Sequence, residues 1–121
     1  MIHEMRLNNE PFNKIKEGTK TVELRLLDEK RKALRVGDKI IFTNRANNEK
    51  IDVLVTNLFK ADSFEPIYEK YSKVAMGHGQ RWKDERRTYE RKKSIDCHLQ
   101  VYEFEIKKYG CIAIEIEKVL K

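Results

Sequence analysis

Three charged side chains, Lys20, Glu23 and Arg25, lie close together in one short stretch of the chain. Polar and apolar residues alternate from Thr21 onward, which predicts a strand with Thr21, Glu23 and Arg25 on one face. Lys20 stands where the chain turns into this strand. On a concave surface such a cluster can bind a polar or anionic ligand. On a solvated surface it is a salt-bridge cluster worth less than about 1 kcal/mol per pair.

The chemistry open to these groups falls into two classes, binding and catalysis. Arg25 offers a planar fork to a phosphate or a base edge, and Lys20 offers a point charge. In a binding site, Glu23 would orient Arg25 or accept a hydrogen bond from a base amino group. In an enzyme, Glu23 would be the general base and Lys20 would stabilise negative charge. No Ser, Cys or His adjoins them in the sequence, so no nucleophile is predicted.

A second candidate surface lies in the strongly basic segment 81–93, within which a helix is expected over 82–93. Seven basic and three acidic side chains give this segment a charge of +4, against +6 for the whole chain. Basic side chains on one helix can track phosphates, and a tryptophan can stack on an unpaired base. A solvated helix face is the alternative. The candidate nucleic-acid ligands in this segment are Arg81, Trp82, Arg86, Arg87 and Arg91.

Composition limits the remaining possibilities. The 121 residues are enough for one domain. The two cysteines, Cys97 and Cys111, are expected to be reduced thiols of a cytoplasmic protein, because no secretory signal is visible. No apolar run is long enough to cross a bilayer, so no membrane contact is expected. No spacing of side chains predicts a metal ion or an organic cofactor.

Short elements must position these residues. Residues 62–65 have the form of a capping box, with Asp62 in the capping place of a helix. Residues 102–106 suit a strand or a helix, and residues 73–101 are expected to form a helical, basic insertion. The pattern favours one α+β domain over residues 1–121, with a small, mostly antiparallel sheet curled into a barrel. Strands are expected at 2–7, 21–26, 39–43, 50–59 and 111–119, helices at 9–17 and 63–71, and a short turn or helix at 28–33.

Four pieces of the sequence, in order, resemble the ASCH domain of the PUA-like superfamily. They are Pro11-Phe12 with Ile15 and Gly18, then Gly18–Arg25, then Leu34–Phe42, and last Lys108–Ile116. The resemblance covers both ends of the chain but not residues 72–101. It implies a PUA-like β-barrel of five or six mostly antiparallel strands flanked by helices. It also implies that Lys20, Glu23 and Arg25 line a cleft, and that the chain near residues 102–109 is a turn or helix.

The resemblance also carries functional expectations. The family as a whole is thought to bind RNA, and some members are assigned RNA cleavage or deacylation of acetylated cytidine. In the deacylating group a Thr nucleophile is expected where this chain has Glu23, and an acid is expected at positions 74–77, which hold no carboxylate. We therefore expect binding of single-stranded or looped RNA first. A small hydrolase acting on RNA or a modified nucleoside is second, and a protein-interaction domain is third.

Overall fold

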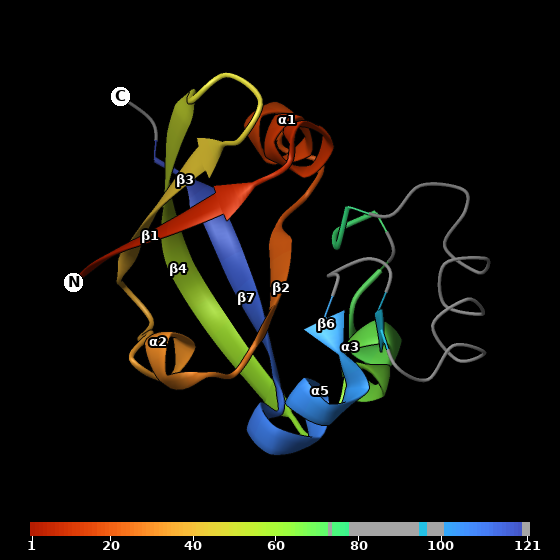
Figure 1. The fold of residues 1–121 in the computed structure, drawn as a ribbon. Coiled ribbons are helices and arrows are strands. Elements are labelled where there is room, and N and C mark those ends of the chain that lie inside the picture. Colours follow the sequence, from red (N-terminus) through yellow and green to blue (C-terminus); the bar gives the residue numbers. More distant parts are fainter. Residues whose placement is uncertain (73, 78–94, 97–100, 120–121) are drawn as a thin grey trace.

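Five strands form one mixed, strongly curled sheet in the computed structural model, which describes residues 1–72, 74–77, 95–96 and 101–119 (Figure 1). The order across the sheet is β1-β3-β4-β7-β2, with β1 parallel to β3 and the other pairs antiparallel. This half-barrel confirms the predicted α+β class and the mostly antiparallel, barrel-like sheet. The strands are β1 (Ile2–Leu7), β2 (Val22–Leu26), β3 (Lys39–Asn44), β4 (Lys50–Ala61) and β7 (Cys111–Lys118).

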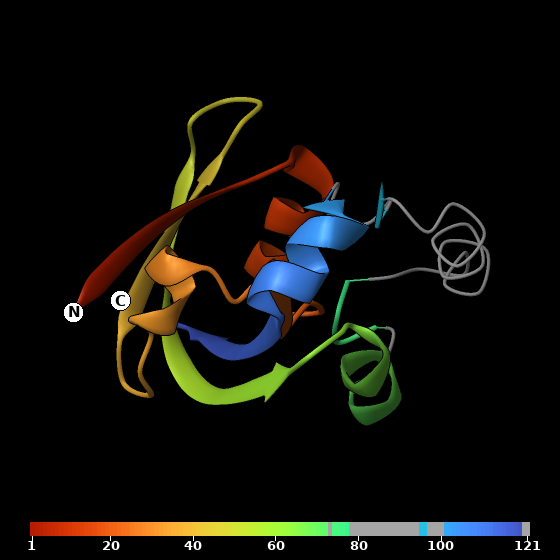
Figure 2. The same ribbon diagram turned by 60° about the horizontal axis from the view of Figure 1, so that its bottom comes forward.

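The long strand β4 gives the sheet much of its curl. Its register against β7 shifts between Val55 and Asn57, which marks a β-bulge. A bulge increases the local twist and bends its strand, and Figure 2 shows β4 curving strongly along its length. In this order β1 and β2 are the two edge strands of the sheet, and both contribute residues to the site described below.

Short helices connect the strands. Gly18, with φ of 90°, ends the first helix as its spacing predicted, and its N–H donates to the Ile15 carbonyl. None of the helices in the described residues is long and apolar enough to cross a membrane. The helices are α1 (Asn9–Glu17), α2 (Glu29–Lys32), α3 (Glu65–Lys70) and α5 (Glu103–Tyr109). A small second sheet pairs β5 (Ile95–Asp96) with β6 (Val101–Tyr102).

Two predictions about local structure are corrected. Asp62 does not cap α3, because the N-cap residue is Phe64, which makes no side-chain capping bond. Phe64 is fully buried, so packing of its ring sets where this helix begins. The predicted helical insertion 73–101 contains strand β5, because residues 95–96 pair with β6. The predicted helix at 82–93 lies outside the described residues. Residues 102–106 were expected to form a strand or a helix, and the structure has a helix over residues 103–109.

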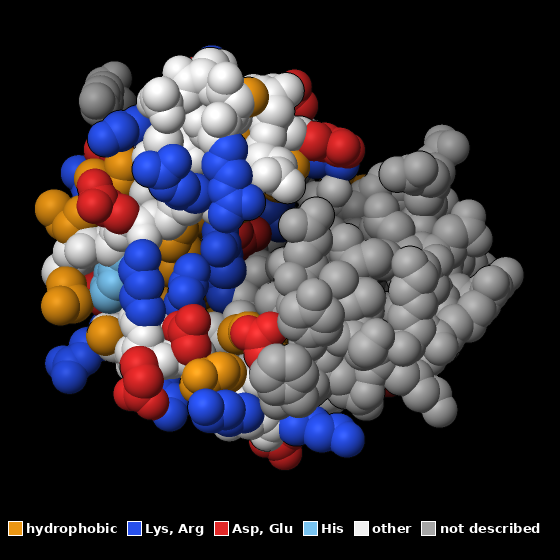
Figure 3. All heavy atoms as spheres, in the orientation of Figure 1, with side chains coloured by type: hydrophobic (Ala, Val, Ile, Leu, Met, Phe, Trp, Pro, Cys, Tyr) orange, Lys and Arg blue, Asp and Glu red, His pale blue; other side chains and the backbone are white. Residues whose placement is uncertain are grey.

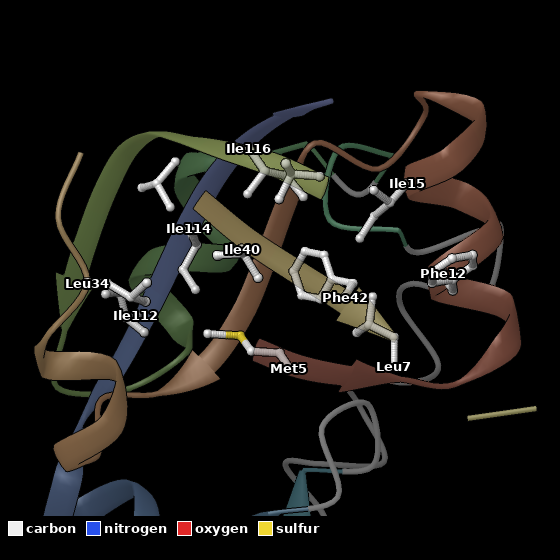
Figure 4. Packing of buried hydrophobic residues seen from close by; sticks show 12 residues of the cluster. Met5, Leu7, Phe12, Ile15, Leu34, Ile40, Phe42, Ile112, Ile114 and Ile116 are labelled. Carbon is white, nitrogen blue, oxygen red and sulfur yellow. The ribbon is translucent and has the colours of Figure 1, made fainter. Parts of the chain in front are cut away.

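The core has two parts that meet at β7. Ile112, Ile114 and Ile116 pack inside the half-barrel with Phe42 and other apolar residues (Figure 4). The intervening Cys111 and Ala113 belong to a second cluster, which includes Val22 and Leu24 of β2 and Phe64 and Ile67 near α3. Because alternate residues of a strand point to opposite faces, β7 is buried on both sides. The alternation predicted for this strand is confirmed.

Asp38, just before β3, holds the start of β1 in place through hydrogen bonds. Its carboxylate accepts hydrogen bonds from His3 Nε2 at 2.8 Å and from the Arg35 N–H at 3.0 Å. The hydrogen bond from His3 is the main cause that holds the pKa of Asp38 below its usual value. A lowered pKa means that the ionised carboxylate is favoured in the folded chain.

This carboxylate predicts a pH dependence of stability. Its contribution is complete above the pKa in the unfolded chain, about 3.9, and is lost as the pH falls through the lower folded value. We expect the difference in free energy of unfolding between the natural chain and Asp38→Asn to be largest near neutral pH. Urea titrations between about pH 6 and pH 2 measure it, and a difference that stays constant over this range would contradict the assignment.

Candidate functional site

The start of β2 brings the three predicted charged residues together. Lys20 Nζ lies 3.3 Å from Glu23 Oε1, and Arg25 places Nη2 and Nε at 2.8 Å and 2.9 Å from Glu23 Oε2. Only 2% of Lys20 and 3% of Glu23 are exposed. The interpretation of this cluster as a solvated surface salt bridge is therefore wrong. The apolar face of β2 packs in the core, and the other face carries a buried ion triad.

Lys20 is fully committed to contacts within the protein. Besides its ion pair with Glu23, Nζ donates to the backbone oxygens of Val22 at 2.8 Å and Met76 at 2.7 Å. These three acceptors match the three protons of an ammonium group, whereas a neutral amine could satisfy only two. Lys20 thus acts as a fixed positive charge that connects β2 to the turn at residues 74–77.

The turn at residues 74–77 is also held from two other directions. The backbone N–H of Val22 donates to the Ala75 carbonyl at 3.0 Å, and Lys14 Nζ donates to the Gly77 carbonyl at 2.7 Å. Sequence reasoning placed no contact between this turn and β2. The chain between them gives no local signal, since the partners of Lys20 are up to 56 residues away.

Gly77 lies against Lys20 and predicts a sensitive position. Its φ is +83°, and a Cβ there would be 2.8 Å from Lys20 Cδ. Because the ammonium is anchored, the Lys20 chain cannot move aside cheaply. Gly77→Ala is expected to lower the free energy of unfolding by more than the roughly 1–2 kcal/mol of left-handed strain alone, as measured by urea unfolding.

Gly37→Ala is the matched control for Gly77→Ala. Gly37 has a similar φ of +95°, but nothing lies within 4 Å of a Cβ added there. The difference between the two variants isolates the contact with Lys20 from the backbone strain. Equal losses of stability in the two variants would show that this contact does not matter.

The charges of the triad shift one another's pKa values. Burial lowers the pKa of Lys20, and the nearby Glu23 carboxylate only partly opposes this effect. Burial by itself raises the pKa of Glu23, but Lys20 and Arg25 together outweigh it, so that this pKa lies below its ordinary value. A carboxylate with a lowered pKa is a weak proton acceptor. The direction of this shift and the contacts of Glu23 with Lys20 and Arg25 suit a carboxylate that positions Arg25 better than one that accepts a proton.

Arg25 is the member of the triad that reaches the surface. Its Nη2 donates to the backbone oxygen of Arg6 at 2.8 Å, and so joins edge strand β2 to edge strand β1. Its side chain is 19% exposed. Unlike Lys20 and Glu23, Arg25 lines an open groove, whose other lining residues come from β1, α2, β3, the turn after β3 and the start of β4.

This groove, which we call the basic groove, has a volume of about 690 Å³. In Figure 3, Lys and Arg side chains gather in a band across the middle of the face on which it opens. Among the described residues, six cationic side chains and one acidic side chain line it, which together carry a charge of +5. The lining residues are Arg6, Arg25, Lys30, Arg31, Arg45 and Lys50, together with Glu4, Met5, Thr43 and Asn48.

Several separate elements supply these cations. Arg6, Thr43 and Lys50 stand in one row across β1, β3 and β4, because the register pairs Arg6 with Thr43 and Thr43 with Lys50. Lys30 on α2 donates to the Glu4 backbone oxygen at 2.7 Å. Arg6 and Lys50 are exposed and form no ion pair with any residue that the structure describes. Their charges are thus available to a ligand.

Sequence reasoning missed most of this groove. Arg6, Lys30 and Lys50 are far apart in the sequence, and they come together through the pairing of β1 with β3, the pairing of β3 with β4 and the hydrogen bond of Lys30 to β1. The polar alternation of each strand was the available signal, but it does not give the register. Among the described residues, no group of His, Cys, Asp or Glu could hold a metal ion. The candidates that lie outside the described residues are Arg81, Trp82, Arg86, Arg87 and Arg91.

Comparison with known proteins gives the class of this chain. The sequence model of the ASCH domain matches residues 5–120, so the chain belongs to the ASCH domain family. This result confirms the resemblance noted in the sequence. A search of curated proteins finds no match.

Solved structures support the same fold. The chain is similar to the crystal structure of hypothetical protein PH0355, with 32% identity, a TM-score of 0.76, and coverage of 98% of this chain and 100% of that one. It is similar to the solution structure of protein PF0455 from Pyrococcus furiosus, with 31% identity, a TM-score of 0.68, and full coverage of both chains. An ASCH domain from Lactobacillus crispatus JV V101 shares the fold, with 14% identity, a TM-score of 0.56, and coverage of 97% and 79%.

Proposed function

We propose that this ASCH domain binds single-stranded or looped RNA, with phosphates of the RNA in the basic groove. The observation that carries the proposal is that, among the described residues, six cations from separate elements and one acid line the same open groove. Lys20 and Glu23 are proposed to position Arg25, because they are buried and Arg25 alone of the three lines the groove. Family membership supports nucleic acid as the kind of ligand.

The electrostatics of the groove favour a polyanion. Each phosphate that is neutralised releases counterions, which makes the binding strong at low salt and weak at high salt. A groove with a charge of +5 can hold several phosphates, whereas a small neutral nucleoside would leave most of its cations unused. The absence of any strong apolar lining is consistent with this ligand, since Met5 is the one apolar residue among the described lining residues.

The direct test uses purified protein and a labelled panel of single-stranded, hairpin and duplex RNAs at two salt concentrations. Native and denaturing gels are run side by side. We expect a salt-sensitive shift with intact RNA, and a log–log salt slope of about 0.7 for each phosphate contact to a single strand. If no RNA shifts at the lower salt, the proposal fails.

The basic segment 81–93 is proposed to supply further contacts to the RNA. Its predicted ligands are Arg81, Trp82, Arg86, Arg87 and Arg91. Charge reversal of Arg86, Arg87 and Arg91 to Glu is expected to remove most RNA binding, because three phosphate contacts become repulsive. Gel shifts at low salt measure this effect, and affinity that survives the reversal would restrict binding to the groove.

A second candidate function is hydrolysis of RNA or of a modified nucleoside. The observation that favours it is the buried Lys20–Glu23 pair, because ionisable groups with shifted pKa values are enriched at catalytic sites. Shortened RNA on the denaturing gel, lost in both Glu23→Gln and Lys20→Ala variants that retain native circular dichroism, would establish it. Turnover that persists in either folded variant would exclude that residue from the chemistry.

A further inference from the structure

We infer that the basic groove binds the sugar–phosphate backbone of its ligand and does not read the bases. This inference rests on the proposed function and specifies the part of the RNA that the groove recognises. Single-stranded nucleic acids are commonly held by stacking of bases on aromatic side chains. None of the described residues that line the groove is aromatic, so it offers cations and backbone without a stacking surface.

Arg25, the arginine that connects the triad to the groove, is also poorly placed to read a base edge. An arginine that identifies guanine needs two free donors for a bidentate contact. Arg25 already uses Nε and Nη2 on Glu23 and on the Arg6 carbonyl. The Arg25 guanidinium retains its positive charge and the N–H donors of Nη1, which suit a phosphate oxygen but not a contact with a base through two nitrogens.

The most available cations of the groove stand at a spacing that suits a chain of phosphates. Arg6 and Lys50 flank Thr43 in one row, two strand spacings apart, which is about 10 Å between their backbones. Long flexible side chains at this separation can meet different phosphates of one strand. The groove therefore provides several separated phosphate contacts instead of one base pocket.

Glu4 distinguishes backbone binding from base reading. It is the acidic residue of the groove and is exposed. If the groove holds only phosphates, the Glu4 carboxylate repels the ligand. If the groove reads bases, Glu4 is the natural acceptor for the amino group of cytosine. The two modes of binding thus predict opposite effects of removing its charge.

The first experiment compares oligomers of equal length by fluorescence anisotropy at one salt concentration. The ligands are oligo(U), oligo(A), oligo(C) and an abasic deoxyribose-phosphate oligomer. The proteins are the natural chain and a Trp82→Ala variant, which removes the aromatic side chain that the sequence predicted to stack. We expect the variant to bind all four ligands within about threefold, because the electrostatic component of binding is independent of sequence.

The outcomes separate this inference from the proposed function. If the groove stacks or reads bases, the abasic oligomer binds the variant at least roughly fivefold more weakly for each base that the groove would otherwise hold, and the inference is overturned while RNA binding stands. If none of the four oligomers binds either protein, the proposed function fails as well. A base preference present in the natural chain and absent in the variant belongs to Trp82, and supports the inference for the groove.

The second experiment uses Glu4→Gln in the full chain, with Asp52→Asn as a matched control. Asp52 lies in the same row of the sheet, where Ile41 pairs with both Glu4 and Asp52, but it forms an ion pair with Lys39 at 3.2 Å and does not line the groove. We expect Glu4→Gln to tighten binding of every oligomer roughly two- to fivefold, and Asp52→Asn to have a smaller effect. A selective loss of oligo(C) binding in Glu4→Gln would overturn the inference.

Discussion

Reversal of Arg6, Arg45 and Lys50 to Glu is expected to weaken RNA binding by at least about a hundredfold near 0.1 M salt. The counterion release from one phosphate contact to a single strand gives roughly a fivefold change in affinity for each tenfold change in salt. Removal of three such phosphate contacts therefore accounts for about two powers of ten, and the new negative charges add repulsion. The log–log salt slope is expected to fall by about two, because three phosphate contacts each contribute about 0.7.

These three side chains are suited to the test because all three are exposed. Their substitution removes charge from the groove and leaves the buried triad and both core clusters intact. Circular dichroism and urea unfolding of the variant should match those of the natural chain. Binding is measured by anisotropy over a range of salt concentrations, so that affinity and slope come from the same titration.

A control variant carries the same change in net charge at a different place. Lys60, Lys107 and Lys108 are exposed and line a separate hollow of about 460 Å³ beside α5. Their reversal to Glu alters the net charge equally but leaves the basic groove unchanged, so we expect only a small loss of affinity from screened, long-range repulsion. If the control loses as much affinity as the groove variant, binding depends on overall charge and the groove is not the site.

Local signals in the sequence predicted single elements of the fold, but they did not predict how distant strands pair. The alternation of Ile112, Ile114 and Ile116 specified strand β7, and Gly18 specified the end of α1, because these signals are local. The row from Arg6 to Lys50 depends on how β1, β3 and β4 pair. No local pattern contains that register, so the groove becomes visible only in the folded chain.

The same reasoning applies to the triad. The spacing of Lys20, Glu23 and Arg25 correctly placed three charges on one element, but spacing does not determine whether a charge is buried. Burial depends on the turn at residues 74–77, which covers Lys20 and accepts its hydrogen bond through Met76. That turn is far away in the sequence and has no charged or aromatic residue to mark it. Of the three residues that the resemblance placed in a cleft, Lys20 and Glu23 are therefore buried, and Arg25 is partly exposed.

Burial of the triad leads to the largest effect on stability that we expect. Glu23→Gln keeps the shape of the side chain but removes the charge that neutralises Lys20 and Arg25. Removal of one partner of a buried ion pair typically costs about 3–5 kcal/mol, because the remaining charge stays out of water without compensation. The expected loss in the free energy of unfolding is of this size, and urea unfolding followed by circular dichroism measures it.

Two comparisons test whether burial is the cause. Glu49→Gln removes the exposed ion pair between Glu49 and Lys16, which should contribute less than about 1 kcal/mol. The double variant Lys20→Met with Glu23→Gln removes both members of the buried pair, so its loss should be smaller than the sum of the two single losses. Additive losses would contradict a direct coupling between the two charges.

The salt dependence of the stability loss distinguishes the buried triad from the exposed Lys16–Glu49 pair. Salt screens exposed charges but acts much less on buried ones. The cost of Glu23→Gln should therefore persist in 1 M salt, where the Debye length is about 3 Å, while the small cost of Glu49→Gln should vanish. A cost of Glu23→Gln that disappeared with salt would mean that water reaches the triad. Lys20 and Glu23 would then be open to a ligand, and the groove would extend to them from Arg25.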